Sequence, residues 1–401
     1  MTAVNPLRVL VVGLGNERIT FLDRFINGIT AQGMVVIIAS SVKPADGRFA
    51  HPERLQWLWS PSWNVSHVRR AQNLIALCVT KLPSKRVRWL MNQVLAQETP
   101  RERIIQLYKL LPFTRAAADV IYFPWNASAI SYKALNQLGI PVVLSCRGSQ
   151  INIRPLMPGA DRYKQELSES FAAAAAVHCV SEDILENATS LGLDPQKAAV
   201  IRPAVDPQFF EPGKDQAENR AFSIITTGSL IWRKGYEYAL LAIKELVDHG
   251  LECCFEIIGS GPEKARLLYT IQDLGLQGCV ALHGKLSPEE IKHRLQQADV
   301  FLLSSLSEGI SNALLEAMSC GLPVVTTDCG GMREAVTNGI EGFVVPLRDT
   351  QAMARALMAL AADPALRARM GQAARARVLK DFQIDQQISA FEKLFNEVTT
   401  K

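Results

Sequence analysis

The chain has 401 residues, of which 48% are hydrophobic and 20% charged, and its formal net charge at pH 7 is +4. This length and composition exclude a small disulfide-stapled protein and a disordered chain, and they favour two domains or three. The net charge is too small for a general nucleic-acid-binding protein, so we expect no nucleic-acid partner.

The eight cysteines are scattered, without a C-x-x-C pair or a cluster with histidine. This spacing indicates free thiols in a reducing compartment rather than a disulfide framework. The first residues are typical of a strand and turn rather than a signal peptide, and no apolar run approaches the roughly 18 to 20 residues that a spanning helix needs. We therefore expect a cytoplasmic protein, with the cytoplasmic face of the inner membrane as the alternative location.

In the first half of the chain, short β-branched runs alternate with longer helical segments. This pattern is typical of parallel sheets with helical crossovers. Gly33, Gly139 and Gly192 are predicted to close helices, and Ser181 is predicted to cap the helix that follows it. The predicted strands are 7–13, 34–40, 120–123, 141–145, 177–180 and 198–201.

Residues 65–118 form a basic segment with ten Lys or Arg and two acids, a local charge of +8 in a chain whose remainder is −4. Apolar residues at helical spacing between Leu74 and Leu95 predict one or two amphipathic helices within it. Such a surface can contact an anionic membrane. An ordinary domain helix with a solvated basic face is the alternative.

The stretch from Arg202 to Gly213 breaks both the strand and the helix periodicity and predicts a domain linker. Beyond it the alternation resumes, and Ser287 followed by Pro288 and two glutamates is typical of a helix start. The predicted strands of this half are 223–227, 254–258, 280–283, 300–304, 324–327 and 342–345.

These elements predict an α/β protein with two doubly wound, Rossmann-like domains. We assign residues 1–205 to the first domain and 206–380 to the second, and residues 381–401 to a C-terminal helix. In such folds ligands bind at the carboxyl ends of the strands, so the crevice is expected between the domains.

Two phosphate-binding motifs are incomplete. Gly13 and Gly15 begin a dinucleotide fingerprint, but Arg18 stands where the third glycine should be, which argues against NAD. This turn can still approach a phosphate, and a simple tight turn is the equal alternative. Residues 278–285 resemble a P-loop, yet Leu286 replaces the magnesium-binding Ser or Thr.

No G-x-S-x-G elbow occurs, and the six histidines have no pair at metal-ligand spacing. The sequence therefore predicts neither a Ser-His-Asp hydrolase nor a metal site.

The most informative stretch follows the predicted strand 300–304. A glutamate, Glu308, comes directly before a glycine turn and a helix start, which places an acceptor beside free backbone N–H groups. Glu316 lies two turns further on in an otherwise apolar helix. A buried, hydrogen-bonded structural acid is the alternative interpretation of Glu316.

The pair of glutamates in this context resembles the retaining nucleotide-sugar glycosyltransferases of family 4, which have the GT-B fold. The resemblance covers nearly the whole chain, and its motifs occur in the family's order. They are Val205-Asp206, Lys234-Gly235 in the turn from Gly228, Gly259-Ser260-Gly261-Pro262, Ser307-Glu308-Gly309 with Asn312 and Glu316-Ala317, Gly321-Leu322-Pro323-Val324-Val325, and Gly330-Gly331-Met332-Arg333-Glu334.

The resemblance implies transfer of a hexose from a UDP- or GDP-sugar to a glycan or lipid-linked saccharide in cell-surface polysaccharide biosynthesis, without a metal or other cofactor. It implies that Lys234 contacts the diphosphate, that Glu316 accepts hydrogen bonds from the ribose and that Glu308 holds the donor sugar. It also implies that the C-terminal helix crosses back to the first domain. The helix-start residues implied to bind the donor are Gly309, Ile310, Ser311, Asn312 and Ala313.

Two positions depart from the family's pattern. Ser229 stands where relatives commonly have an arginine, and Arg233 is the candidate replacement for that diphosphate cation. Arg147, followed by Gly148 and Ser149, stands where many relatives have a histidine, so we predict that Arg147 contacts donor or acceptor, with a structural salt bridge as the alternative.

Gly284 and Lys285 are predicted to approach the nucleotide base. Two other functions remain open at this point: a nucleotide-sugar epimerase of the same architecture, and a catalytically silent nucleotide-binding subunit of a polysaccharide assembly complex.

Overall fold

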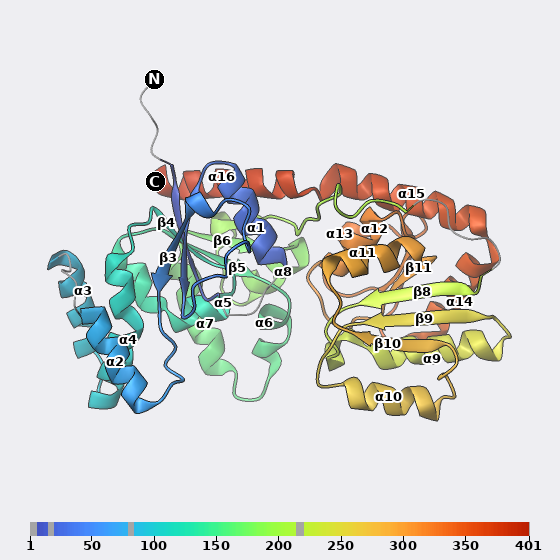
Figure 1. Cartoon of the computed structure of the whole chain (residues 1–401), viewed down its shortest axis with the longest axis horizontal. Coiled ribbons are helices and arrows are strands. Elements are labelled where there is room, and N and C mark those ends of the chain that lie inside the picture. Colours follow the sequence, from blue (N-terminus) through green and yellow to red (C-terminus); the bar gives the residue numbers. More distant parts are fainter. Residues whose placement is uncertain (1–5, 15–19, 79–83, 214–219, 401) are drawn as a thin grey trace, which may run out of the picture.

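The computed structural model describes residues 6–14, 20–78, 84–213 and 220–400. Figure 1 shows two lobes side by side, each built around a twisted sheet that is covered by helices. The first sheet has seven strands in the order β3-β2-β1-β4-β5-β6-β7, and the second has six in the order β10-β9-β8-β11-β12-β13. All strand pairs of both sheets are parallel, which requires the helical crossovers seen in each lobe.

The strands are β1 (Arg8–Val12), β2 (Val35–Ser40), β3 (Leu55–Trp59), β4 (Val120–Phe123), β5 (Val142–Cys146), β6 (Ala176–Cys179), β7 (Ala198–Val200), β8 (Phe222–Thr227), β9 (Cys253–Ile258), β10 (Val280–Gly284), β11 (Val300–Leu303), β12 (Val324–Thr327) and β13 (Gly342–Val345).

The α-helices are α1 (Thr20–Ala31), α2 (His67–Cys78), α3 (Ser84–Leu95), α4 (Pro100–Leu110), α5 (Asn126–Ser131), α6 (Ser149–Asn152), α7 (Asp161–Ala173), α8 (Glu182–Ser190), α9 (Tyr236–Asp248), α10 (Lys264–Asp273), α11 (Pro288–Gln297), α12 (Asn312–Ser319), α13 (Met332–Ala335), α14 (Thr350–Ala362), α15 (Pro364–Asp381) and α16 (Ile384–Thr400). Short 3₁₀ helices include η2 (Leu111–Arg115), η3 (Lys133–Leu138) and η6 (Trp232–Lys234).

Every strand expected from the sequence is present to within one residue at each end, and one strand, β3, was not expected. β3 lies at the edge of the first sheet and pairs only with β2. Its sequence, LQWLW, is interrupted by a glutamine and only partly buried. A half-buried edge strand needs no continuous apolar run, which is why the hydrophobic pattern missed it.

The range from Leu74 to Leu95 contains parts of two helices, α2 and α3, as predicted, and a third helix that was not predicted, α4, follows in the basic segment. The third is marked by a capping box in which Thr99 and Glu102 exchange hydrogen bonds, with Pro100 in the first turn. Buried side chains of α2 and α3, such as Leu77 and Leu90, join the core of the first lobe. Of the described residues, no helix is both long and apolar enough to cross a membrane.

The C-terminal helix returns to the first lobe, as the resemblance implied. The chain runs along the second lobe as α15 and continues as α16, which Figure 1 shows lying across the first lobe. Phe391 and Phe395 are buried there, with the ring of Phe391 4.8 Å from that of Phe25 on α1. This aromatic packing ties the end of the chain to the first lobe.

His178 is the centre of a buried polar network in the first sheet. Its Nε2 donates to the carbonyl oxygen of Ile201 at 2.8 Å, and its Nδ1 accepts from the Ser145 hydroxyl at 2.7 Å. The hydroxyl of Tyr122 lies 2.8 Å from that of Ser145. Burial, together with the charge of Arg147, lowers the pKa of His178 to about 3.

We expect His178 to make folding sensitive to mild acid. Because its pKa is lower in the folded than in the unfolded chain, its contribution is complete above pH 6.5 and declines as the pH falls, by about 2 kcal/mol at pH 5. Urea unfolding at pH 7 and pH 5 measures this loss. His178→Gln should be less stable at pH 7 but show a smaller loss between the two pH values; an equal loss would contradict the assignment.

Candidate active site

The candidate site lies where the carboxyl ends of the strands of both lobes meet. The loop after β11 carries Glu308 and approaches the loops after β5 and β6 of the first lobe. Gly309 lies so close to the first lobe that a Cβ there would stand 2.7 Å from Val180 Cγ2. The side-chain amide of Asn152 also donates to the Glu308 carbonyl oxygen at 3.4 Å.

Glu308 is buried and faces two cations. Its Oε1 accepts from the ammonium of Lys234 and from the Ser305 hydroxyl at 3.1 Å. Its Oε2 lies 3.7 Å from Nη1 of Arg233. Burial alone would raise the pKa of Glu308, but the two cations outweigh it and the pKa is lowered. Glu308 is therefore an ionised carboxylate, suited to accepting hydrogen bonds from sugar hydroxyls.

Lys234 is held by the tight turn that ends η6. Gly235 has φ = 60°, and a Cβ at this position would overlap the carbonyl oxygen of Ser304. The Ser304 hydroxyl donates to the Lys234 carbonyl oxygen at 3.0 Å, and the amide of Leu306 donates to the Arg233 carbonyl oxygen at 2.7 Å. These contacts to backbone carbonyl groups join η6 to the Glu308 loop. They hold Lys234 and Arg233 next to Glu308.

The turn after Glu308 leads into α12, and the predicted donor-binding residues, Gly309 to Ala313, span this turn and the first two residues of the helix. Ser311 caps the helix by accepting from the amide of Leu314 at 3.4 Å. The amides of Asn312 and Ala313, in the first turn, have no helical carbonyl to bond. They add partial positive charge next to the Lys234–Glu308 pair.

Glu316 lies on α12 and forms an ion pair with Arg24, which comes from α1 of the first lobe. The guanidinium of Arg24 also lies 5.7 Å from the centroid of the Phe210 ring. Burial raises the pKa of Glu316, and the charge of Arg24 opposes this rise without cancelling it. Within the described ranges, Nη1 of Arg24 is buried without a hydrogen-bond partner.

Arg147 lies in the first lobe, at the carboxyl end of β5. Its Nε donates to the Pro124 carbonyl oxygen at 3.2 Å, and its guanidinium stacks 4.1 Å from the centroid of the Phe21 ring. Arg147 also lines a small pocket together with Arg24 and Asn312. The arginine is therefore close to the start of α12, although no ion pair links it to Glu308 among the described residues.

The remaining predicted residues that the structure describes lie at or after the carboxyl ends of strands in the two sheets. Ser229 follows β8 and its carbonyl accepts from the amide of Ile231. Gly284 ends β10, and its carbonyl accepts from Gly259 at 2.8 Å, while Lys285 is exposed. Gly13 ends β1 with φ = 96°, and Gly15 lies outside the described residues.

Tyr236 was not predicted from the sequence. Its hydroxyl is buried without a hydrogen-bond partner in the part of the chain that the structure describes. Burial, with the charge of Glu308, raises the pKa of Tyr236. The hydroxyl lies beside Gly228, 3.1 Å from where a Cβ would stand, and Nζ of Lys234 is 3.6 Å from the same point. An unsatisfied donor beside Lys234 suits a bound anion.

Glu334 was likewise not predicted to join the lobes. Its carboxylate accepts from the amide of Glu182 and from Nε of Arg202, both at 2.8 Å. Among the described residues, no three or more acidic, His or Cys side chains are placed to hold a metal.

Solved structures with the same arrangement of lobes define the class of fold. Anabaena HepE, solved in complex with UDP and glucose, superposes with a TM-score of 0.70 over 98% of this chain and 100% of its own, at 14% identity. A glycosyltransferase from Rickettsia africae gives a TM-score of 0.71 over 98% and 99% of the two chains, at 16% identity. The protein has the GT-B fold.

Sequence comparisons then give the family. The model for glycosyl transferases group 1 matches residues 208–377, and the model for glycosyltransferase family 4 matches residues 81–209. The amylovoran biosynthesis glycosyltransferase AmsK of Erwinia amylovora is 32% identical over 66% of this chain and 67% of its own length. The chain belongs to this family of group 1, family 4 glycosyltransferases.

A second relative, described as the putative colanic acid biosynthesis glycosyltransferase WcaL of Salmonella typhimurium, is 30% identical over 60% of this chain. The match spans 61% of the length of WcaL.

Proposed function

We propose that this glycosyltransferase moves a hexose, with retention of configuration, from a nucleotide-diphosphate sugar to a glycan or lipid-linked saccharide in cell-surface polysaccharide biosynthesis. The observation that carries the proposal is the Lys234–Glu308 pair beside the start of α12, with Glu316 two turns further along the same segment. The relatives' roles in amylovoran and colanic acid biosynthesis, and the UDP bound to HepE, support the pathway and the donor class.

The site supplies the charges that such a donor requires. Lys234, Arg233 and the first amides of α12 would neutralise the diphosphate as it leaves, and the Tyr236 hydroxyl would donate a further hydrogen bond. Glu308 would accept from hydroxyls of the donor sugar, and Glu316 from the ribose. No metal or other cofactor enters this proposal.

The reaction would exchange one bond at the anomeric carbon for another. The bond from that carbon to the phosphate oxygen breaks, the bond to the acceptor oxygen forms on the same face, and the acceptor proton passes to the departing phosphate. This route needs no covalent enzyme nucleophile. Arg147, at the first-lobe side of the same crevice, would contact either the phosphate or the acceptor.

The helices α2 to α4 support a peripheral contact with an anionic membrane as part of the proposal. They carry most of the basic segment, and several of their large apolar side chains are exposed. Cationic and apolar groups on one surface favour binding to anionic lipid. The exposed apolar residues are Val68, Ile75, Met91, Leu95 and Ile104.

A nucleotide screen tests the donor site. We expect UDP or GDP to raise the melting temperature equally with and without magnesium, and ADP and NAD to leave it unchanged, because a ligand at 100 times its Kd adds about 2.7 kcal/mol. Glu316→Gln should weaken nucleotide binding about 10- to 100-fold, since a hydrogen bond to a charged group contributes about 1.5–3 kcal/mol. The exposed Glu289→Gln on α11 is the matched control.

Turnover separates the proposal from its alternatives. With an extract that contains acceptors, the transferase should release free nucleotide and label a glycan, and Glu308→Gln should lower that turnover more than nucleotide affinity. A protein that binds nucleotide but releases none from the donor would be the silent subunit. Ser229 and Arg147 are the observations behind this alternative, because both depart from the family's pattern. Nucleotide release without any labelled acceptor would indicate an epimerase.

A further inference from the structure

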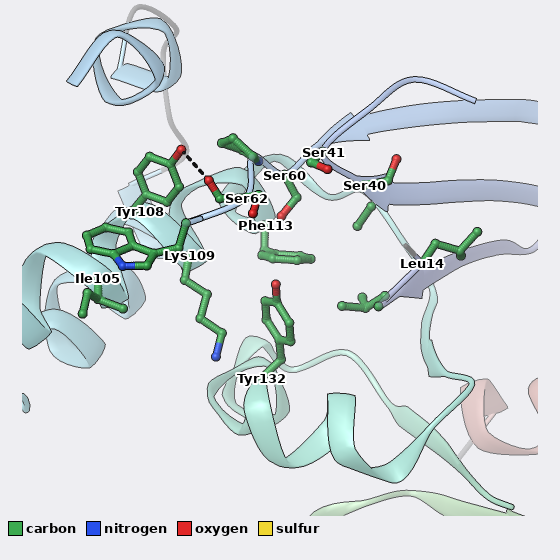
Figure 2. Close-up of a pocket in the computed structure, with 15 residues that line it drawn as sticks. Leu14, Ser40, Ser41, Ser60, Ser62, Ile105, Tyr108, Lys109, Phe113 and Tyr132 are labelled. Atoms are coloured by element: carbon green, nitrogen blue, oxygen red, sulfur yellow. Dashed lines mark hydrogen bonds between the residues drawn. The ribbon is translucent and has the colours of Figure 1, made fainter. Parts of the chain in front are cut away.

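A second cavity of about 410 Å³ lies in the first lobe, at the carboxyl ends of β1, β2 and β3. Gly13, Ser40 and Ser60 line it from the strand ends, and residues of α4 and η2, with Tyr132 between α5 and η3, close it from the other side. In Figure 2 the side chains of Lys109 and Tyr132 approach this space from opposite sides. Its volume is in the range of small-molecule sites, and ligands of α/β sheets bind at this edge.

Aromatic rings and hydroxyl groups make up much of the wall. The rings of Trp63 and Tyr108 meet edge to face at 5.4 Å, and those of Phe113 and Tyr132 at 5.5 Å. The Tyr108 hydroxyl donates to the Ser62 carbonyl oxygen at 3.1 Å. Flat apolar rings combined with hydroxyl groups suit a sugar ring, which has both C–H faces and hydroxyl edges.

Lys109 is the charged side chain of this wall. Its ammonium donates to the Ser131 carbonyl oxygen and lies 4.4 Å from the centroid of the Tyr132 ring. No carboxylate of the described residues lies within 4.0 Å of it. Burial lowers the pKa of Lys109, which means that the environment disfavours the charged ammonium. A bound anion would relieve this cost.

The surroundings of the cavity are positive as well. The wall includes α4, which belongs to the basic segment of charge +8. Arg70 of α2 stacks over Trp63 at 4.5 Å from the ring centroid. The positive electrostatic field of these helices therefore attracts anions to the cavity. The aromatic rings and hydroxyl groups of the wall suit a sugar.

We propose that this cavity holds a negatively charged part of the acceptor saccharide and that Lys109 selects it. The inference rests on the proposed function and narrows its acceptor to an anionic saccharide. The cavity and the candidate active site share the carboxyl edge of the first sheet, since Gly13 ends β1 and Arg147 follows β5 on that edge. The negative group is either a carboxylate of the sugar or a phosphate attached to it.

Binding measured by calorimetry in the presence of saturating UDP tests the inference. The probes are methyl glucuronide, glucose 6-phosphate and the neutral methyl glucoside. We expect at least one charged probe to bind tenfold or more tightly than methyl glucoside, and the tighter of the two identifies carboxylate or phosphate as the source of charge. Equal affinities for all three, or no binding of any, would overturn the proposal.

Variants assign the selectivity to Lys109. Lys109→Met should bind all three probes equally, Lys109→Arg should keep the preference, and Lys133→Met, at an exposed lysine on η3, should behave as wild type. A preference that survives Lys109→Met would refute the role of this lysine. The melting-temperature shift with UDP and GDP is read on the same samples. A wild-type protein that shifts with a nucleotide but shows no anion preference refutes this inference alone, whereas a missing shift with both nucleotides refutes the donor site.

Discussion

Replacing Lys234 by methionine is expected to lower both stability and turnover by large factors. The ammonium pairs with the buried carboxylate of Glu308, and removing one partner of a buried pair costs about 3–5 kcal/mol. The same ammonium would stabilise the departing diphosphate, and loss of one such donor lowers turnover about 10²- to 10³-fold. Urea unfolding and nucleotide release measure the two effects.

The double variant Lys234→Met/Glu308→Gln separates structure from chemistry. It removes the unpaired buried charge, so it should recover much of the lost stability while its turnover stays as low as that of Lys234→Met. Arg233→Met is the control and should lose less stability than Lys234→Met. Its guanidinium is 3.7 Å from Glu308 and is more exposed than the Lys234 ammonium. A double variant that regained turnover would show that the reaction needs neither the Lys234 ammonium nor the Glu308 carboxylate.

The sequence predicted the alternating fold well because parallel strands buried on both faces are nearly continuous apolar runs. β4 and β12 illustrate this, since all four residues of each are buried. β3 was missed for the opposite reason. It is an edge strand, and only the backbone hydrogen-bonding groups that face β2 are paired within the sheet. Capping residues, such as Ser181 and Ser287, marked helix starts correctly because their hydrogen bonds are local.

The site was predicted less completely because its pairings connect distant parts of the chain. Glu308 and Lys234 could be named from their motifs, but the pairing of Glu316 with Arg24 spans 292 residues and has no local signal. Tyr236 follows directly after Lys234-Gly235, yet only the fold shows that its hydroxyl is buried beside Lys234. In the sequence, Lys109 is one of ten basic residues with nothing to distinguish it. Only the fold shows that it lines the cavity at the strand ends.

Replacing Arg24 by methionine is expected to make nucleotide binding more sensitive to acid. Burial already raises the pKa of Glu316, and the charge of Arg24 is what opposes this rise. Without Arg24 the carboxyl should take up a proton at a higher pH, and a protonated carboxyl loses the charge that strengthens its bonds to the ribose hydroxyls. UDP affinity should therefore fall on acidification in both proteins, beginning at a higher pH in Arg24→Met.

The measurement is the Kd for UDP between pH 5.5 and pH 9 in wild type, Arg24→Met and Arg24→Lys. The terminal phosphate of UDP also titrates, near pH 6, but it does so in every sample, so the differences between proteins isolate the effect on Glu316. Arg24→Lys retains the positive charge and should follow wild type, and the gap for Arg24→Met should narrow as the pH rises. Tighter binding by Arg24→Met at every pH would instead show that Arg24 competes with the ribose for Glu316, and that the ion pair between the lobes must open before the donor binds.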